Sequence, residues 1–465
     1  MGHGMNSMKS ARVIAILALL GLAAPDVLRA QVGVPPRGAT LALAWAQAMA
    51  SVVNSTLCTN FLQQGGGATP EQGAACLTAA GFAGSANAVA IRSAAPEELT
   101  AANVLLKELA HRQLDQLNQR LEYWRAPDHS QQFAALPLLA SLNPQETAAQ
   151  SGGLSQDFGR WGVFANLAGD SGRRSATDLT DSFDLRGFNL TAGADYRLSS
   201  AWVIGGIAGY TDERAEFDAT PGTGGRLEHS GFSLLAYGQY EGQSAYVTGS
   251  VGWQQLNQRL ERTGSYVDPI HLDAGGNNLS ASIAATGSTH IGALFATLQS
   301  GYSWNAGATS VEPYLQLQYR HSELDAFTES GGAGAVTDGT TSYPFDINMS
   351  YAGARVTSLD GTMGLKWQRV VNGAIGVYVP FLNAEYTHQF NDTPYTVAGM
   401  LAPLSGIVPD FTLPADALSG HYYSVIAGCN YVARGGLQAY LQIRSSFKQA
   451  NLSDHSLTAG LRHEL

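Results

Sequence analysis

The final eleven residues constrain the fold more than any other stretch of the chain. Apolar side chains occupy every second position there, at Leu457, Ala459, Leu461 and Leu465, with His463 as the exception. A period of two predicts a strand with one apolar face and one polar face. A chain that ends on such a strand must pair it on both sides, and a closed barrel does so by joining the last strand to the first.

The N-terminus predicts export. Lys9 and Arg12 precede an apolar run from Val13 to Ala24, which is followed by small residues and an expected cleavage site before Gln31. A charged, then apolar, then small-residue pattern is typical of a secretory signal. The run is about twelve residues, whereas a membrane-spanning helix needs roughly 20. We therefore expect residues 1–30 to be a signal peptide, and any membrane insertion to occur without helices.

The composition is compatible with a membrane barrel. Charged residues make up only 14% of the chain, glycine occurs 53 times and the formal net charge is −11. Soluble domains usually carry about 25% charged residues, whereas alternating lipid-facing and pore-facing residues give intermediate hydropathy. The negative charge argues against a nucleic-acid partner, since such partners favour a basic surface.

Alternating segments continue through the C-terminal two-thirds of the chain. One example is the run from Leu359 to Trp367, in which apolar side chains and glycine alternate with polar ones. The same pattern occurs in an order that predicts about twelve strands: 158–169, 183–198, 201–215, 228–241, 244–260, 286–305, 309–322, 351–369, 373–391, 420–433, 436–447 and 455–465. A soluble sandwich also alternates, but the signal peptide and the aromatic strand ends favour an all-β transmembrane barrel of antiparallel strands.

The connections between these segments alternate in length. Tight turns are expected at 198–201 and 433–436, and long loops at 216–227, 261–285, 323–350 and 392–419. An even strand count with short periplasmic turns and long outer loops is the usual pattern of outer-membrane barrels.

Three of these segments resemble the autotransporter β-domain family of type V secretion. The run SFDLRGFNLTAGADYRL at 182–198 looks like its second strand, VPFLNAEYTHQF at 379–390 resembles a late strand, and AGLRHEL at 459–465 is similar to its terminal strand. The resemblance covers about 300 residues in strand order. It implies a twelve-stranded translocator threaded by a helix, with outer-membrane lipid and the secretion and barrel-assembly machinery as partners. One departure is Leu465, where family members usually have Phe or Trp.

Residues 96–125 are expected to form that helix. Pro96, Glu97 and Glu98 suit a first turn, and about 28 residues at 1.5 Å each give about 42 Å, more than the ~30 Å hydrocarbon core. Apolar residues follow at spacings of three and four: Leu106, Ala110, Leu114, Leu117, Leu121 and Trp124. The pattern alone also suits an amphipathic helix of a small soluble domain. The resemblance favours a helix that threads the pore, in a lumen lined by Asp195, Arg197, Lys366 and Arg444.

Some family members cut this helix at an Asn-Asn pair. Here the helix holds only single asparagines, Asn103 and Asn118, so we expect no self-cleavage.

The segment before the helix, 31–95, is expected to be a short helical stub that resembles a passenger. Cys58 and Cys76 flank the Gly65–Gly67 tract, and in an oxidising compartment we expect them to form a disulfide rather than remain buried thiols. Cys429 shares strand parity with Val425 and Ala427, which predicts an inert lipid-facing thiol.

No catalytic, metal or cofactor site is expected. The string Gly169-Asp170-Ser171-Gly172 resembles nucleophilic-serine motifs, but it falls where we expect the first hairpin to turn, and glycine, aspartate and serine are common turn residues. A serine nucleophile also needs a base and an orienting acid, and no His-centred block supplies them. The eleven histidines are scattered.

These observations predict five regions: a signal peptide (1–30), a short stub (31–95), a pore-threading helix (96–125), a linker (126–154) and a β-barrel (155–465). The expected function is that of a monomeric outer-membrane translocator, not an enzyme, that carries its own short N-terminal segment to the cell surface. The alternative is a structural protein or adhesin that binds through the loops at 261–285, 323–350 and 392–419.

Overall fold

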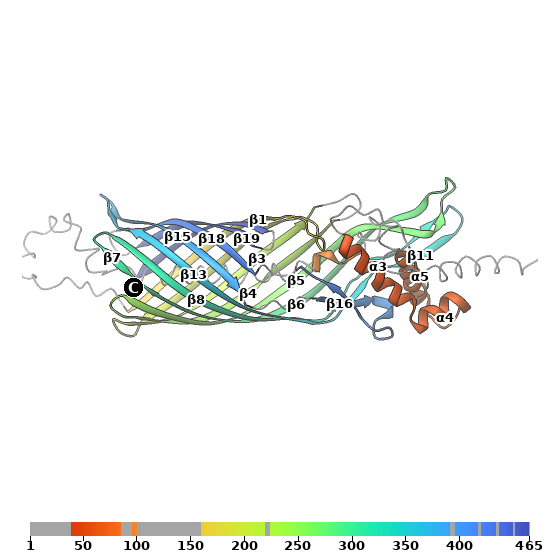
Figure 1. The fold of residues 1–465 in the computed structure, drawn as a ribbon, viewed down its shortest axis with the longest axis horizontal. Helices are drawn as coiled ribbons and strands as arrows, with labels where there is room; N and C mark the ends of the chain where they lie inside the picture. Colours follow the sequence, from red (N-terminus) through yellow and green to blue (C-terminus); the bar gives the residue numbers. More distant parts are fainter. Residues whose placement is uncertain are drawn as a thin grey trace, which may run out of the picture.

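The computed structural model describes the β-barrel, three N-terminal helices and the beginning of a fourth helical segment (Figure 1). The described residues are 39–84, 95–99, 102, 160–218, 224–390, 396–416, 420–433, 437–449 and 452–464. The expected signal peptide, the linker, Leu465 and the six apolar positions of the expected pore helix (Leu106, Ala110, Leu114, Leu117, Leu121 and Trp124) lie outside them.

Twelve long antiparallel strands form the barrel within the described residues, in the predicted order. They are β1 (Trp161–Arg174), β2 (Phe183–Arg197), β3 (Trp202–Phe217), β4 (Gly224–Glu241), β5 (Ala245–Leu272), β6 (Asn278–Tyr302), β8 (Thr309–Leu324), β13 (Ala354–Arg369), β15 (Gly376–Gln389), β18 (His421–Ala433), β19 (Gln438–Gln449) and β20 (Leu452–Glu464). Two short strands, β7 (Trp304–Ala306) and β14 (Val371–Asn372), extend turns of the same sheet.

The first and last strands close the sheet, as the terminal alternation predicts. β1 pairs with β20 from Gly162↔Glu464 to Arg174↔Leu452, and β8 pairs with β13 on the other side. In β20, Leu457 and Leu461 are exposed on the outer wall, whereas Arg462 is buried. The period of two therefore assigns both the strand and its lipid-facing side.

The long connections differ from the expected loops. Residues 261–285 are mostly strand, because β5 and β6 extend far beyond their neighbours and meet at a turn around Gly276, whose φ is +83°. The expected loop at 216–227 is shortened in the same way, because β3 reaches Phe217 and β4 begins at Gly224. The expected loops at 323–350 and 392–419 contain short strands and a 3₁₀ turn: β9 (Phe327–Thr328), β10 (Ala333–Thr337), β11 (Ser342–Asp346), β12 (Met349–Tyr351), β16 (Thr396–Leu401), η1 (Ala402–Leu404) and β17 (Phe411–Pro414).

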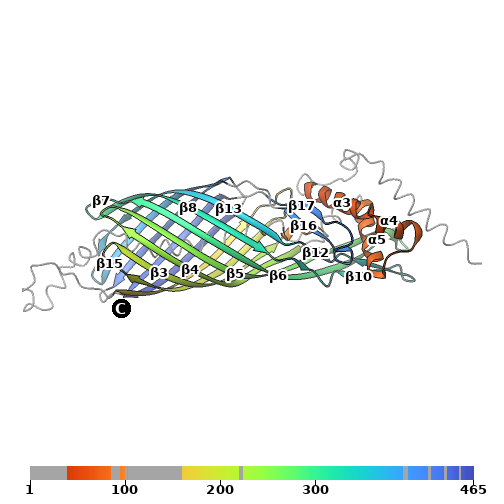
Figure 2. The same cartoon turned by 90° about the horizontal axis from the view of Figure 1, so that it is seen from below.

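The two ends of the barrel are unlike. The short turns lie at the end where the C-terminus lies, and the three helices lie at the other end, beyond the long hairpins (Figures 1 and 2). We call this second end the cap end. β9, β12, β16 and β17 form a small sheet in the order β17-β16-β12-β9, and β10 pairs with β11 in a separate hairpin.

The helices form a compact layer that we call the cap: α3 (Ala39–Val53), α4 (Thr56–Gln64) and α5 (Pro70–Gly84). Local sequence sets their ends. Ser55 accepts a hydrogen bond from the Cys58 amide at the start of α4, and Gly65 ends it at φ +71°. At the start of α5, Thr69 and Gln72 exchange hydrogen bonds in a capping box.

No single helix among the described residues is long and apolar enough to cross a membrane, although Thr40–Val53 and Thr56–Gln64, bent by 70°, pass that test as a pair.

Candidate functional site: the capped end of the barrel

The outer wall changes from apolar to polar part-way along the strands. On β5 the exposed residues are first apolar (Val247, Val251 and Trp253) and then polar (Gln255, Asn257 and Arg259). The buried, inward-facing residues change in the opposite sense, from Thr248, Ser250 and Gln254 to Leu256 and Leu260, although polar Gln258 lies between these two leucines. Lipid therefore contacts only the part of the outer wall near the short turns. At the cap end the outer wall is polar and the interior is largely apolar, as in a soluble protein.

Aromatic side chains mark both edges of this apolar belt. At the cap end Phe188, Tyr210 and Phe232 form a row with ring centroids 6.1 and 5.1 Å apart. Near the short turns the pairs are Trp161–Tyr196 and Trp202–Tyr240, at 4.9 and 5.1 Å. From Phe188 to Tyr196 the chain covers about 26 Å of strand, or about 20 Å of depth at a tilt near 40°. That height is close to the hydrophobic band of such barrels.

The structure places the predicted pore-lining residues on the inner wall. Asp195 is buried and accepts a hydrogen bond from the Tyr237 hydroxyl at 3.1 Å, and Arg197 has the same strand parity. The Lys366 ammonium lies 5.0 Å from the centroid of the Phe381 ring. Arg444 forms an ion pair of 3.1 Å with Glu385, a partner that our sequence reasoning missed. Glu385 lies two residues after the buried Asn383 on β15, so the alternation could have placed Glu385 on the inner wall.

The cap and the barrel share one apolar core. Trp45 of α3 is fully buried and lies edge-on to Phe411 of β17, with ring centroids 5.4 Å apart. Phe82 of α5 contacts Tyr266 of β5, which in turn stacks on Phe345 of β11 at 4.2 Å. The extension of β5 beyond the lipid belt is therefore a wall that the cap packs against.

A disulfide holds the cap together, as the sequence predicted. Cys58 and Cys76 are bonded, with Cα atoms 5.3 Å apart, and both are fully buried. An ideal Cβ at Gly73 would lie 2.6 Å from the Phe61 ring, so α4 and α5 can approach this closely only with glycine there. Cys429 lies on the outer wall of β18, half-buried and without a disulfide.

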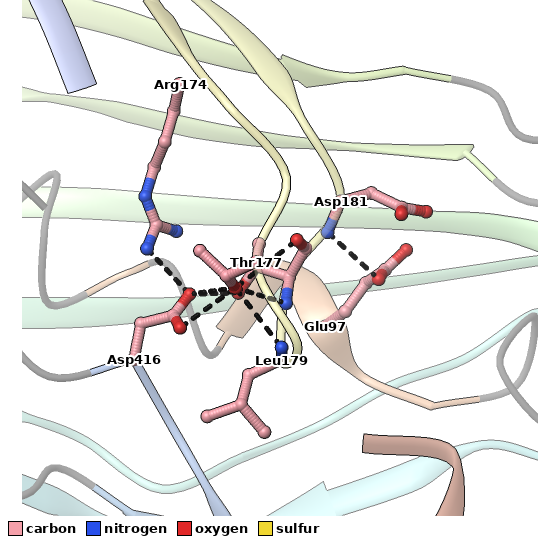
Figure 3. A network of polar contacts seen from close by, with 7 residues as sticks. Glu97, Arg174, Thr177, Leu179, Asp181 and Asp416 are labelled. Atoms are coloured by element: carbon pink, nitrogen blue, oxygen red, sulfur yellow. Dashed lines mark hydrogen bonds and ion pairs between the residues drawn. The ribbon is translucent and has the colours of Figure 1, made fainter. Parts of the chain in front are cut away.

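The segment after the cap enters the cap end of the barrel. Residues 97–99 are helical, and Glu97, Glu98 and Leu99 are buried. Glu97 accepts a hydrogen bond from the Asp181 amide at 3.3 Å (Figure 3). An ideal Cβ at Gly225 of β4 would meet the Glu98 carboxylate at 2.0 Å, so that glycine makes room for it.

Burial raises the pKa of Glu98 to about 8, mainly because the charged form loses hydration, while the nearby Arg262 opposes the rise. The carboxyl group is therefore mostly protonated near neutral pH.

Asp416, from the segment after β17, is the centre of a polar network that we call the latch (Figure 3). Its carboxylate accepts hydrogen bonds from Arg174 at 2.7 Å, from Thr177 at 2.9 and 3.0 Å, and from Thr180 at 2.7 Å. Arg174 and Asp416 are both buried, with side chains 1% and 10% exposed. The latch joins the β1–β2 loop to the β15–β18 connection, and the Leu41 amide of α3 bonds the Asp178 carbonyl of the same loop.

A second buried ion pair fastens the small sheet to β5. Arg262 donates to both carboxylate oxygens of Glu329, at 3.2 and 2.6 Å, and to the carbonyl of Ile347 at 3.0 Å. The Tyr351 hydroxyl and the Met349 amide also donate to Glu329. The sequence offered no signal for this pair, because both residues fall in segments expected to be loops.

The Gly-Asp-Ser string is not at a turn, contrary to our expectation. It lies within β1, where Asp170 is buried on the inner wall and Ser171 is exposed on the outer wall. Ser171 stands opposite Arg186 and His455 in the strand register, and His455 bonds Ser445 at 2.9 Å. Successive residues of a strand point to opposite faces, so Asp170 cannot orient a base beside Ser171. Across the described residues, no three His, Cys, Asp or Glu side chains are grouped so as to hold a metal ion.

Comparison with known families gives one match over most of the barrel. The family model described as Autotransporter beta-domain matches residues 163–444.

Two curated relatives are similar over part of their length. Esterase EstA of Pseudomonas aeruginosa is 26% identical over 190 residues, which cover 39% of this chain and 27% of the esterase. An extracellular serine protease of Serratia marcescens is 23% identical over 175 residues, 38% of this chain and 15% of the protease. The matched region thus spans about a quarter or less of these relatives.

Among solved structures, the translocator domain of the autotransporter NalP from Neisseria meningitidis is similar at a TM-score of 0.46 and 15% identity, covering 67% of this chain and 91% of that one. The β domain of the Bordetella autotransporter BrkA has a TM-score of 0.40 and 16% identity, covering 66% and 100%.

Proposed function

We propose that this chain, which belongs to the autotransporter β-domain family through residues 163–444, carries its own N-terminal segment to the cell surface and keeps it there as a folded cap. The family implies a translocator barrel of the bacterial outer membrane. The cap, at residues 39–84, lies outside the residues that the family model matches.

The observation that carries the proposal is the position of the cap. It packs on the end away from the short turns (Figures 1 and 2), and long connections face outward in outer-membrane barrels. At the cap end, the described chain runs to Ala102, and just before it Glu97 contacts the β1–β2 loop and Glu98 contacts β4. The described chain resumes at Arg160, whose guanidinium donates a hydrogen bond to the Tyr196 hydroxyl at the short-turn end. The chain between these residues has to connect the two ends.

We therefore propose that residues 96–125 thread the pore as a helix. Polar lumen residues such as Asp195, Lys366 and Arg444 suit the mixed polar surface of that segment. Since the barrel closes on itself through β1 and β20, a monomer is sufficient for this function. This function needs no chemical step: the closed sheet satisfies its backbone hydrogen bonds in lipid. We propose no catalytic role for the chain.

Epitope insertion into intact cells tests the orientation. A tag inserted at Gly66, in the exposed glycine tract between α4 and α5, should bind antibody on unbroken cells. The matched control is the same tag at Ser200 in the β2–β3 turn, which should be reached only after lysis. A Gly66 tag that stays inaccessible until lysis would contradict surface display.

Single-channel recording tests the helix. Deletion of residues 103–125 should raise the conductance of the reconstituted barrel, because the polar lumen then fills with water. An unchanged conductance would show that these residues do not occupy the pore.

The contacts of the cap favour this function over the adhesin alternative. Phe345 and Phe411, which lie in two of the long connections expected to bind outside partners, are instead buried in the core shared with the cap. The inward-facing side chains of these two connections therefore pack against the cap and hold it in place.

A further inference from the structure

Two histidines stand directly opposite each other on the outer wall at the cap end. His388 is the last but one residue of β15 and His421 is the first residue of β18, and the strand register pairs them. Both side chains are exposed. The register therefore brings together two histidines that stand at opposite ends of the connection at 389–420.

The backbone hydrogen bonds show that this pair is of the close type. The Gln389 amide donates to the Gly420 carbonyl directly across the two strands, at 2.9 Å, so these two residues form a hydrogen-bonded pair. Hydrogen-bonded and non-hydrogen-bonded pairs alternate along antiparallel strands. His388 and His421 are consequently a non-hydrogen-bonded pair, in which the Cα atoms are about 4.5 Å apart and the side chains are closest.

Aromatic rings flank both imidazoles. The His388 ring meets Phe390 edge-on with ring centroids 5.1 Å apart, and the His421 ring stacks on Tyr386 at 6.1 Å. Tyr386 also packs against Tyr423, its partner in the register, with ring centroids 5.4 Å apart. These contacts restrict the two imidazoles and so lower the entropy cost of ordering them around a ligand.

Neither of the two facing imidazoles makes a hydrogen bond or an ion pair within the described part of the chain. Other histidines of the outer wall do, since His321 bonds the Thr357 hydroxyl at 2.8 Å and His455 bonds the Ser445 hydroxyl at 2.9 Å. A neutral imidazole has one nitrogen that accepts. The facing pair therefore offers two nitrogen lone pairs to a ligand.

Two nitrogen ligands on one close pair suit a divalent transition-metal ion. Imidazole nitrogen binds zinc at about 2.0–2.1 Å and also suits copper and nickel, whereas Mg²⁺ and Ca²⁺ prefer oxygen ligands. No third His, Cys, Asp or Glu of the described residues is grouped with the pair, so water supplies the other positions. The expected ion is therefore exchangeable, unlike a structural zinc with four protein ligands.

One positive charge lies close to the pair. The Lys448 ammonium is 5.8 Å from the centroid of the Tyr423 ring, and Tyr423 is the next outward-facing residue of β18 after His421. A nearby cation opposes a bound metal ion, so the affinity has to come from nitrogen–metal bonds. An ion that is held by charge alone, such as Mg²⁺, should gain nothing at this place.

We propose that His388 and His421 form a binding site for a divalent transition-metal ion, represented by Zn²⁺, that joins the two ends of the β15–β18 connection. This connection carries β17 and Asp416, through which it contacts α3 and the β1–β2 loop. An ion that binds the paired histidines stabilises the folded connection more as its concentration rises above its Kd. The site goes beyond translocation, and the proposal does not depend on which way the cap faces.

Isothermal titration calorimetry with Zn²⁺ tests the site on the full chain in neutral detergent, with an affinity tag that contains no histidine. His388→Gln and His421→Gln should each weaken binding at least about tenfold, since even the loss of an outer-shell partner costs about 10–100-fold. His455→Gln, which removes another exposed histidine of the outer wall, should leave the affinity unchanged, and Mg²⁺ should not compete. Equal weakening by all three variants, or equal affinity of the wild type and the double variant, would overturn the proposal. Resistance of each variant to SDS at room temperature confirms that it is folded.

Amide hydrogen exchange shows whether the ion joins the two strands. The Gln389 amide bonds Gly420 beside the histidine pair. Its protection should rise at least about tenfold at a Zn²⁺ concentration about 100 times the Kd, and only in chains that keep both histidines. The control is the Leu198 amide, which bonds the Trp202 carbonyl at the short-turn end and should not respond. No gain at Gln389, or the same gain at Leu198, would refute the proposed link between β15 and β18.

Discussion

Asp416→Asn is expected to loosen the cap end while leaving the membrane barrel intact. The substitution keeps the shape of the side chain but removes the charge that faces Arg174, whose side chain is 1% exposed. Breaking a buried ion pair by removing one partner costs 3–5 kcal/mol. Because Arg174 has further contacts and the amide oxygen still accepts from Thr177 or Thr180, we expect the lower value, about 3 kcal/mol.

Amide hydrogen exchange of the full chain in detergent measures this loss directly. The reporting amides are those of Leu41, Leu179 and Thr180, which bond the Asp178 carbonyl or the Thr177 hydroxyl. A loss of about 3 kcal/mol corresponds to a fall of about 100-fold in their protection. Amides in the middle of β19 should keep theirs, because they lie in a separate part of the sheet.

Asp184→Asn is the matched control. The Arg173–Asp184 pair has a similar distance, 2.8 Å, but its side chains are 57% and 41% exposed, and exposed pairs contribute about 0–1 kcal/mol. The control should change protection less than fivefold. If both variants lower protection equally, or if Asp416→Asn leaves it unchanged, burial does not make the latch strong and the reasoning is wrong.

Three other perturbations have definite expected outcomes. In the folded cap the pKa of Glu98 is raised from 4.5 to about 8. The protonated carboxyl group therefore stabilises the cap fully below about pH 4.5, and this stabilisation is lost as the pH rises through 8. Between pH 6 and 9 the free energy of unfolding of the wild type should fall by about 2–3 kcal/mol. Urea unfolding followed by Trp45 fluorescence should show this loss, which Glu98→Gln should abolish; a persisting pH dependence would implicate another group. Replacing Cys58 and Cys76 by serine opens a link across a sequence separation of 18 residues and should cost the cap about 3 kcal/mol in the same assay, whereas an unchanged midpoint would mean that packing alone holds α4 against α5. Leu441→Arg puts a charge on the lipid-facing wall, where Leu441 is 53% exposed, and should cost about 2–4 kcal/mol of barrel stability in vesicles. Asn257→Arg, on the polar part of the outer wall of β5 beyond the aromatic row, should be tolerated, and equal losses would contradict the assigned edge of the belt.

The sequence by itself determined the membrane barrel. A period of two fixes which residues share a face, and lipid outside with a polar lumen inside fixes which face is apolar. Leu457 and Leu461 thereby identified both the closing strand and its outer side, and the same pattern gave the twelve strands in order. The disulfide followed from the same sequence, since two cysteines in one short exported segment have few other partners.

Only the tertiary structure decided what happens beyond the lipid. On β5 the apolar face switches from outside to inside after Trp253, within the strand predicted at 244–260. The strand then continues to Leu272, where the sequence predicted a loop from residue 261. The contacts that matter there join residues far apart in the chain: Arg174 with Asp416 and Arg262 with Glu329. A period of two carries no information about such pairs, because they depend on which long connections fold back over the cap. The physical reason is the change of solvent at the edge of the belt, where water outside and a shared protein core inside replace lipid outside and a polar lumen inside.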